Sequence, residues 1–342
     1  MTGKKVFYIG PGFIGWNVVE LLVNEGYDVT AMVRRKEHSL QIENTGAKTV
    51  FGDLHDKDVI TNETAKADIV IHTATADDPV SVEAVLAGIS RRAAANAHTI
   101  YMHTSGTSVI SAPTPDRIYA DSDRAAIDAL ADDAPHRAID LSIVRKAAEL
   151  GSNAKCAIMM PPDIYGFNPV HGRLSIQLPT LARFALVHGY AGHVKKGAGV
   201  WSAVHVRDLA RGYLVLLHAL EQKPAEWVLE NPYFFCENGS EFSWKEASER
   251  ISAALLSAGR IAVSQVREIG ESEYGELFGP ATEVVLWSNS RSRAVRLREL
   301  GWEPREKGVF ESLVQDELPE ILRDWDARTA DQKTSAYAAR VA

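Results

Sequence analysis

Short apolar runs alternate with amphipathic stretches along the first half of the chain. The apolar runs predict strands over residues 4–10, 27–35, 47–53, 67–74, 98–105 and 154–162. Ile14, Val18 and Leu21 fall on one face of a helix predicted over residues 13–25, and a second helix is predicted over residues 79–96. Strands that are apolar throughout and alternate with helices are typical of a parallel sheet with both faces covered. The pattern therefore predicts an α/β fold, a Rossmann-type doubly wound sheet.

The alternation of predicted strands and helices changes past about residue 165, where glycine and histidine become frequent. We expect residues 1–165 to form a dinucleotide-binding domain that parts of residues 200–240 complete. Residues 166–328 should mainly form a smaller, C-terminal substrate-binding lobe. The small and polar residues of 329–342 predict a flexible tail.

Composition and charge limit the classes of binding partner that the protein can have. The 342-residue chain has a net charge of −8, which argues against binding nucleic acid, because that would need a basic surface. Cys156 and Cys236 are too few for a cysteine-rich zinc site, and no metal is expected. No apolar run approaches the roughly 20 residues of a membrane helix. We expect a cytoplasmic protein with a small-molecule substrate and no membrane partner, and a homodimer stays open.

Glycines mark the turn after the first predicted strand. Gly10, Gly12 and Gly15 spell G-x-G-x-x-G between that strand and an amphipathic helix, with Phe13 and Ile14 inside the motif. Small residues let the backbone approach a pyrophosphate, and the helix N-terminus offers free N–H groups and partial positive charge. The motif predicts dinucleotide binding by these five residues.

The end of the second predicted strand indicates which dinucleotide is bound. NAD sites carry an acidic residue about 20 residues after the glycines, to hold the ribose 2′-hydroxyl. Here Met32 and Val33 occupy that window, and Arg34 and Arg35 follow. A guanidinium binds a 2′-phosphate with paired hydrogen bonds. The sequence therefore favours NADP(H) over NAD(H), with Arg34 on the phosphate.

Seven motifs in one order resemble the short-chain dehydrogenase/reductase superfamily, in its extended or atypical, epimerase/dehydratase-like branch. They are "IGPGFIG", "GDLHD", "IHTAT", "YMHTSG", "PPDIYG", "WSAVHVRDLA" and "LRELGWEP", and they span nearly the whole chain. The resemblance implies that Asp53 and Leu54 lie at the adenine. It also implies that Ala74 lines the cofactor ribose and that Pro161 lies beside the nicotinamide. Ser105 would hydrogen-bond the substrate oxygen.

One family feature is missing from the chain. The resemblance implies a catalytic tyrosine followed four residues later by lysine, yet none of the 10 tyrosines has a lysine at that spacing. By position, His136 and Asp140 take those two places. His136 is one candidate for carrying the proton, because imidazole titrates near neutrality. Tyr165 in "PPDIYG" is the other, and Thr107 and Ser108 stand near the expected serine as well as Ser105.

Three functions remain open from the sequence. The first is an NADP(H)-dependent reductase or dehydrogenase acting on a small, fairly apolar carbonyl or hydroxyl compound. The second is a non-redox enzyme on the same fold, an isomerase, dehydratase, cyclase or lyase. The third is an NADP(H)-sensing regulatory protein. We favour the first. Aromatic residues in "NPYFF", "EFSW" and "VVLW" are numerous enough to line an apolar substrate pocket, although most of them should be core residues.

Overall fold

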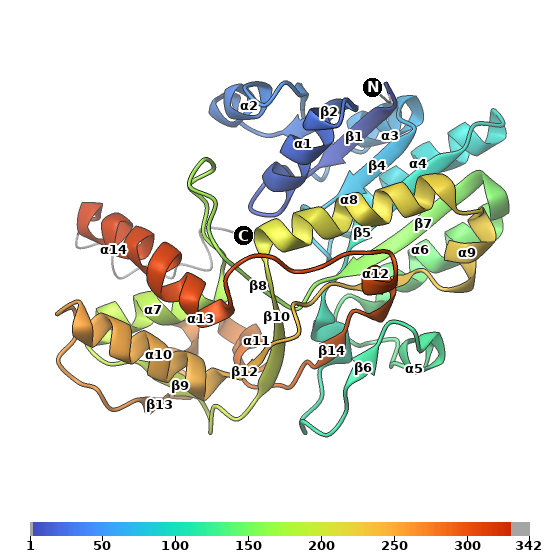
Figure 1. Ribbon diagram of the computed structural model, residues 1–342. Helices are drawn as coiled ribbons and strands as arrows, with labels where there is room; N and C mark the ends of the chain where they lie inside the picture. Colours follow the sequence, from blue (N-terminus) through green and yellow to red (C-terminus); the bar gives the residue numbers. More distant parts are fainter. Residues whose placement is uncertain (1–2, 330–342) are drawn as a thin grey trace.

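A seven-stranded sheet forms the centre of the computed structural model, which describes residues 3–329 (Figure 1). Its strand order is β11-β7-β5-β4-β1-β2-β3, and every pairing is parallel. The strands are β1 (Lys5–Ile9), β2 (Asp28–Val33), β3 (Lys48–Phe51), β4 (Ile69–His72), β5 (Thr99–Thr104), β7 (Ala154–Met160) and β11 (Tyr233–Phe235). Continuous burial of β1, β4 and β7 explains their apolar sequences.

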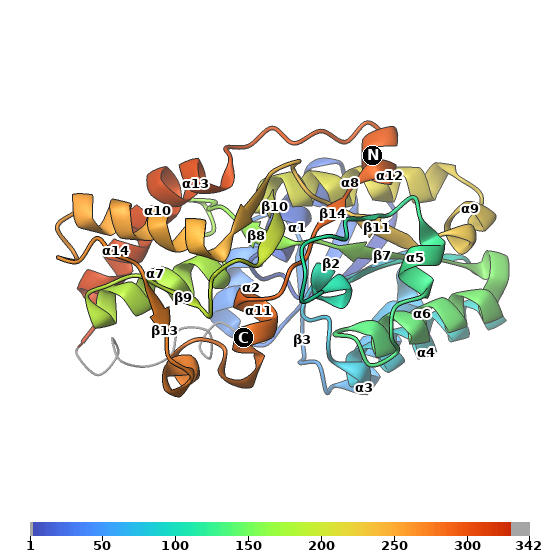
Figure 2. The same cartoon turned by 90° about the horizontal axis from the view of Figure 1, so that it is seen from below.

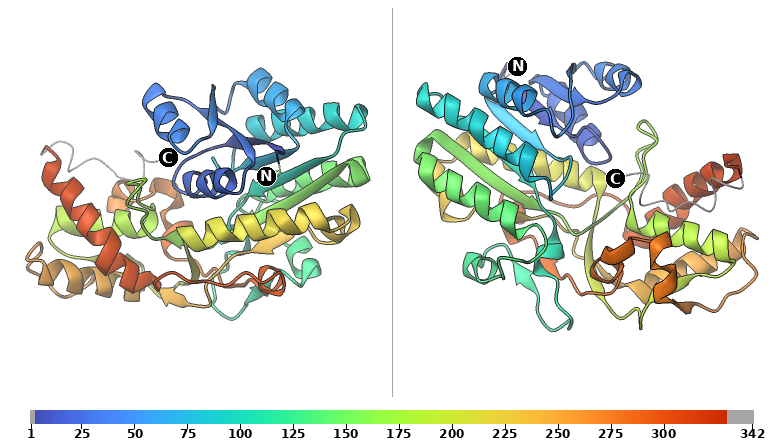
Figure 3. Two further views of the ribbon diagram at one scale, coloured as in Figure 1. Left: turned by 45° about the horizontal axis from the view of Figure 1, so that its top comes forward. Right: turned by 180° about the vertical axis from the view of Figure 1, so that it is seen from behind.

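Helices cover both faces of this sheet (Figures 2 and 3). On one face α1 packs against α8, and on the other α4 packs against α3 and α6. Their bounds are α1 (Gly15–Asn24), α3 (Lys57–Lys66), α4 (Pro79–Ala94), α6 (Arg137–Leu150) and α8 (Val206–Gln222). Helix α2 (Lys36–Glu43) packs beside β2 and β3. The predicted doubly wound Rossmann-type fold is therefore confirmed.

The strand order reverses at β1. From β1 the chain runs outward through β2 to β3, and it then returns to place β4 on the other side of β1. Ligands of doubly wound sheets bind beyond the carboxyl ends of the strands at such a switch point. The residues that follow β1, β2, β4, β5 and β7 are therefore the ones that can form a site.

A second apolar core lies in the C-terminal half. It joins α7 (Gln177–His188), α10 (Trp244–Ser257) and α14 (Leu318–Ala327) to a small sheet of β8 (Asp163–Tyr165), β10 (Val200–His205) and β12 (Glu241–Ser243). Phe242 packs its ring against Trp244 at 5.1 Å between centroids. Strands β9 (Gly192–Val194) and β13 (Arg267–Ile269) form a further pair.

Two buried aspartates tie the C-terminal segment to the central sheet. Asp208 accepts hydrogen bonds from the N–H groups of Arg305 and Glu306, and Asp121 accepts from those of Phe235 and Val295. The remaining short elements are β6 (Tyr119–Ala120), α5 (Arg124–Asp128), α9 (Ala225–Glu230), α11 (Thr282–Leu286), β14 (Ser292–Arg293), α12 (Val295–Glu299) and α13 (Val309–Ser312). The N–H donors satisfy the two buried carboxylates and fix the segments that carry those donors.

The domain limits expected from the sequence stay a prediction. Residues 330–342 of the predicted tail lie outside the described residues. Within residues 3–329, no helix combines the length and apolar character needed to cross a membrane.

Candidate active site

The three glycines after β1 have different surroundings. Gly10 has a φ of 88°, which favours glycine, and a Cβ on it would lie 2.4 Å from the backbone of Ala74. A Cβ on Gly15 would lie 2.2 Å from the carbonyl oxygen of Gly10. A Cβ on Gly12, in contrast, would meet nothing within 4 Å. We call residues 10–15 the glycine turn. Gly10 and Gly15 have no room for a side chain, whereas Gly12 leaves open space beside the turn.

Helix α1 presents its N-terminus at the glycine turn. No side chain caps the helix, and within the described residues the N–H groups of Phe13 and Ile14 have no backbone acceptor. Free N–H groups at a helix N-terminus bind anions, and the helix dipole adds to the attraction. Pro11 contributes no N–H. The open space at Gly12 and the two free N–H groups fit the pyrophosphate of a dinucleotide.

The residues predicted at the adenosine end lie after β2 and β3. Arg34 and Arg35 follow β2 and are exposed. The Asp53 carboxylate accepts a hydrogen bond from the N–H of His55 at 2.8 Å, so it organises its own turn. Leu54 is half-buried and packs against the main core. The roles of these residues at the adenine and the 2′-phosphate stay predictions.

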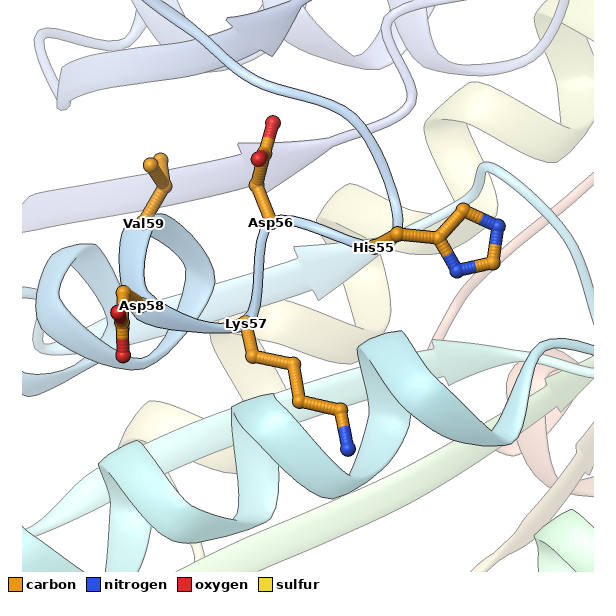
Figure 4. A pocket seen from close by; sticks show the side chains of 5 residues that line it. All are labelled: His55, Asp56, Lys57, Asp58 and Val59. Carbon is orange, nitrogen blue, oxygen red and sulfur yellow. The ribbon is translucent and has the colours of Figure 1, made fainter.

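A shallow hollow of about 420 Å³ lies next to that turn (Figure 4). Five consecutive residues line it, from His55 to Val59. The side chains of His55, Asp56 and Lys57 point in different directions (Figure 4). Because no polar groups converge in this hollow, we assign it no ligand.

Three side chains meet on the same edge of the sheet, farther from the glycine turn. His136 lies at the N-terminus of α6, Ser108 follows β5 and Asp77 follows β4. The Ser108 Oγ is 2.5 Å from His136 Nε2, and the Asp77 Oδ1 is 2.5 Å from His136 Nδ1. Asp77 lies only three positions after Ala74, which packs against Gly10. This His136 cluster (Ser108, His136 and Asp77) therefore adjoins the switch point.

The backbone at His136 is held in a conformation that non-glycine residues rarely adopt. Its φ is 65°, in the left-handed region, and such residues persist where the surroundings fix them. The bonds to Ser108 and Asp77 hold the ring from both sides. Gly106 leaves room for the ring, because a Cβ at this position would lie 3.2 Å from His136 Nε2. The glycine that displaces the expected serine pattern thus gives space to the imidazole.

Ser105 is directed to a different partner. It is buried, and its Oγ donates a hydrogen bond to Asp140 Oδ2 at 3.0 Å. Burial raises the pKa of Asp140 to about 7, while the Ser105 hydrogen bond and the nearby His136 act to lower it. The structure therefore brings Ser105 to Asp140, and it brings Ser108, not Ser105, to His136.

Tyr165 lies away from these groups, in the second core. It is fully buried, its hydroxyl donates to the carbonyl oxygen of Lys307 at 2.8 Å, and it accepts from Asn238 at 2.7 Å. Burial raises the pKa of Tyr165. Pro161 follows β7, and its carbonyl oxygen accepts from the N–H of Thr107. The structure joins Pro161 to the loop of the His136 cluster but gives the Tyr165 hydroxyl two partners of its own.

Comparison with known proteins assigns the chain to a protein family. A family model described as the NAD dependent epimerase/dehydratase family matches residues 10–229. The chain belongs to this family.

Relatives of this epimerase/dehydratase-family chain extend over nearly its full length. "Oxidase ucsJ" of Acremonium sp is 27% identical over 328 residues, covering 88% of this chain and 93% of that protein. A dTDP-glucose 4,6-dehydratase from Bacillus anthracis, solved in complex with NAD, has a TM-score of 0.69 at 15% identity and covers 94% of this chain and 98% of its own. UDP-glucose 4-epimerase of Thermotoga maritima has a TM-score of 0.67 at 15% identity, with 94% and 99% covered. The two solved structures support the fold.

For this family member, sequence reasoning missed Asp77 and chose Ser105 for the substrate oxygen, with Ser108 named only as a neighbour. Asp77 stands in the polar run "ATADDP", where the neighbouring Asp78 caps α4 through the N–H of Ser81. Nothing in that run distinguishes a capping aspartate from one that contacts a histidine 59 residues away. Ser108 had a weak signal, its place in "TSGTS" after a predicted strand.

Proposed function

We propose that this protein is an NADP(H)-dependent reductase or dehydrogenase that acts on a small, fairly apolar carbonyl or hydroxyl compound. The observation that carries the proposal is the hydrogen-bonded chain Ser108–His136–Asp77 at the carboxyl edge of a dinucleotide-binding sheet. An imidazole held by a hydroxyl on one nitrogen and a carboxylate on the other is suited to proton transfer. The full-length relative named as an oxidase favours redox chemistry over the non-redox alternatives.

The cofactor would be held by the glycine turn and the residues after β2. Phe13 and Ile14 would donate N–H groups to the pyrophosphate, across the open space at Gly12. Arg34 would pair with the 2′-phosphate. Bound NADP(H) supplies or accepts the hydride.

The proton would travel through the His136 cluster. In the reducing direction, Ser108 donates its hydroxyl proton to the substrate oxygen as that oxygen gains charge. It recovers a proton from Nε2 of the imidazolium, while Asp77 accepts a hydrogen bond from the Nδ1–H and keeps the ring oriented. The His136 side chain is 17% exposed, so water can return the proton to the ring. In the oxidising direction each proton moves the opposite way.

The apolar character of the substrate rests on the aromatic residues of the second half. Phe234, Phe242 and Trp244 are buried in the two cores. Trp287 is half-buried and packs at the border of the second core.

The test is to add NADPH and a panel of apolar ketones and enones to the purified protein, and to follow the absorbance of NADPH. Turnover that requires His136 supports the proposal. Tight NADPH binding without oxidation would instead support a non-redox enzyme or a regulatory protein, and product analysis with a cell extract would separate those two. NADPH and NADH affinities measured before and after Arg34→Ala test the cofactor: unchanged NADPH affinity would refute the role of Arg34.

A further inference from the structure

Three arginines gather around His38, beside the glycine turn. Arg34 and Arg35 come from the end of β2, and Arg173 comes from the segment between β8 and α7. The Arg173 Nη2 is 3.3 Å from His38 Nε2, and its guanidinium lies 5.7 Å from the centre of the Trp16 ring. Burial, followed by the charges of Arg173, Arg35 and Arg34, lowers the pKa of His38 to about 4.

This cluster has positive charge without a matching carboxylate. Within residues 3–329, none of the three guanidinium groups forms an ion pair, whereas half-buried arginines elsewhere do, such as Arg211 with Glu306 and Arg291 with Glu241. Partial burial and the charge of Arg35 lower the pKa of Arg173. Arg173 is half-buried while Arg34 and Arg35 are exposed, and a half-buried guanidinium beside like charges is costly until an anion balances it. The cluster is therefore suited to bind an anion.

The segment that carries Arg173 is fixed to the first turn of α1. His171 stacks on Trp16 with ring centroids 4.4 Å apart and planes 13° from parallel. The Asn168 side chain donates to Asn17 Oδ1 at 2.8 Å. In Figure 1 this loop rises from the second half toward α1 and α2. Residues 168–173, which we call the strap, thus reach the place where the residues after β1 and β2 meet.

We propose that the strap covers the adenosine end of the bound cofactor and that Arg173 contributes a guanidinium to the 2′-phosphate alongside Arg34. This inference rests on the NADP(H) preference proposed above. A phosphate monoester carries close to two negative charges and three acceptor oxygens, so it can accept hydrogen bonds from more than one guanidinium. The strap would then bind the 2′-phosphate through Arg173, a residue far in sequence from the glycine turn.

Calorimetric titration with adenosine 2′,5′-bisphosphate and with 5′-AMP tests this without requiring turnover. The two probes differ by the 2′-phosphate alone. Arg173→Gln should weaken binding of the bisphosphate roughly tenfold or more, and change the affinity for 5′-AMP by less than about twofold. Arg173→Lys should recover part of the loss, because it keeps the charge without the paired hydrogen bonds. Arg145→Gln, an exposed arginine on α6, is the matched control and should change neither affinity.

Each other outcome has a distinct meaning, provided that thermal unfolding shows the variants to be folded. If Arg173→Gln leaves bisphosphate binding unchanged while Arg34→Gln weakens it, the strap proposal is wrong and the NADP(H) proposal stands. Equal weakening of both probes by Arg173→Gln would mean that the strap holds the adenosine, and it would overturn the phosphate role. A wild-type protein that binds the two probes equally would refute the NADP(H) preference itself.

Discussion

The glycine turn and the His136 cluster lie on the same edge of the sheet but are built in opposite ways. The glycine turn is one continuous segment with open space at Gly12 and uncommitted N–H groups at Phe13 and Ile14. The His136 cluster joins side chains 28 and 59 residues apart, and its polar atoms already bond to one another. An open site with free donors is suited to binding, whereas a closed hydrogen-bond chain is suited to moving a proton.

The comparison predicts that His136 contributes to turnover and not to cofactor binding. His136→Gln should lower kcat by about 10²- to 10⁴-fold, the usual contribution of a general acid–base group. NADPH affinity should change by less than about twofold, because the glycine turn is intact. Steady-state kinetics and fluorescence titration measure the two quantities. His218→Gln, on α8 and paired with Glu25, is the control. A parallel loss of NADPH affinity and kcat in His136→Gln would contradict the division.

The ionisation of Asp140, which lies near His136, makes the free energy of unfolding depend on pH. Burial raises its folded-state pKa to about 7 from a model-compound value of 3.8, so the folded protein binds this proton more tightly than the unfolded chain. The tighter proton binding stabilises the folded protein fully below about pH 4, and this contribution is lost as pH rises through about 7. For Asp140 alone this is a decrease of roughly 2–3 kcal/mol in unfolding free energy between about pH 5 and about pH 8.

Asp140→Asn should make that decrease smaller. Asp163 and Glu317, whose pKa values burial raises to about 8 and about 7, preserve part of it in the variant. Urea unfolding at the two pH values measures the difference. Asp116→Asn, an exposed substitution, should behave as the wild type. An unaltered pH dependence in Asp140→Asn would show that this carboxyl ionises normally in the folded protein.

The two regions also differ in what the sequence could predict. The glycine turn could be interpreted because its determinants lie within six positions that a strand and a helix flank, and the parallel sheet followed from apolar runs such as "ADIVIHTA". The polar helices α2 and α3 were not predicted, because their apolar faces are narrow and weak. Three-residue β11 joins the sheet far along the chain, where local periodicity carries little signal.

The His136 cluster was only partly accessible from the sequence. His136 itself emerged because it occupies the place of an expected tyrosine. Its partners depend on how the ends of β4 and β5 lie beside α6, and no local pattern encodes that arrangement. Arg173 is similar, since its approach to His38 depends on a loop that returns from the second half.

Within the glycine turn, Gly12 and Gly10 should respond differently to alanine. Gly12→Ala adds a Cβ in open space, so stability should change little, while NADPH binding should weaken about tenfold because the Cβ occupies the proposed pyrophosphate path. Gly10→Ala meets the backbone of Ala74 at a positive φ and should cost about 1–3 kcal/mol of stability. Thermal unfolding and fluorescence titration separate the two. Equal destabilisation by both substitutions would refute the distinction.

Asp77 provides the smallest and most discriminating change in the His136 cluster. Its side chain is 64% exposed, so water screens its charge, and Asp77→Asn keeps an oxygen that can accept from His136 Nδ1. We expect kcat to fall by only about three- to tenfold, which corresponds to roughly 1 kcal/mol. Asp77→Ala removes the acceptor and should cost more. A loss in Asp77→Asn as large as that of His136→Gln would mean that the negative charge itself, and not the orientation of the ring, is what the cluster requires.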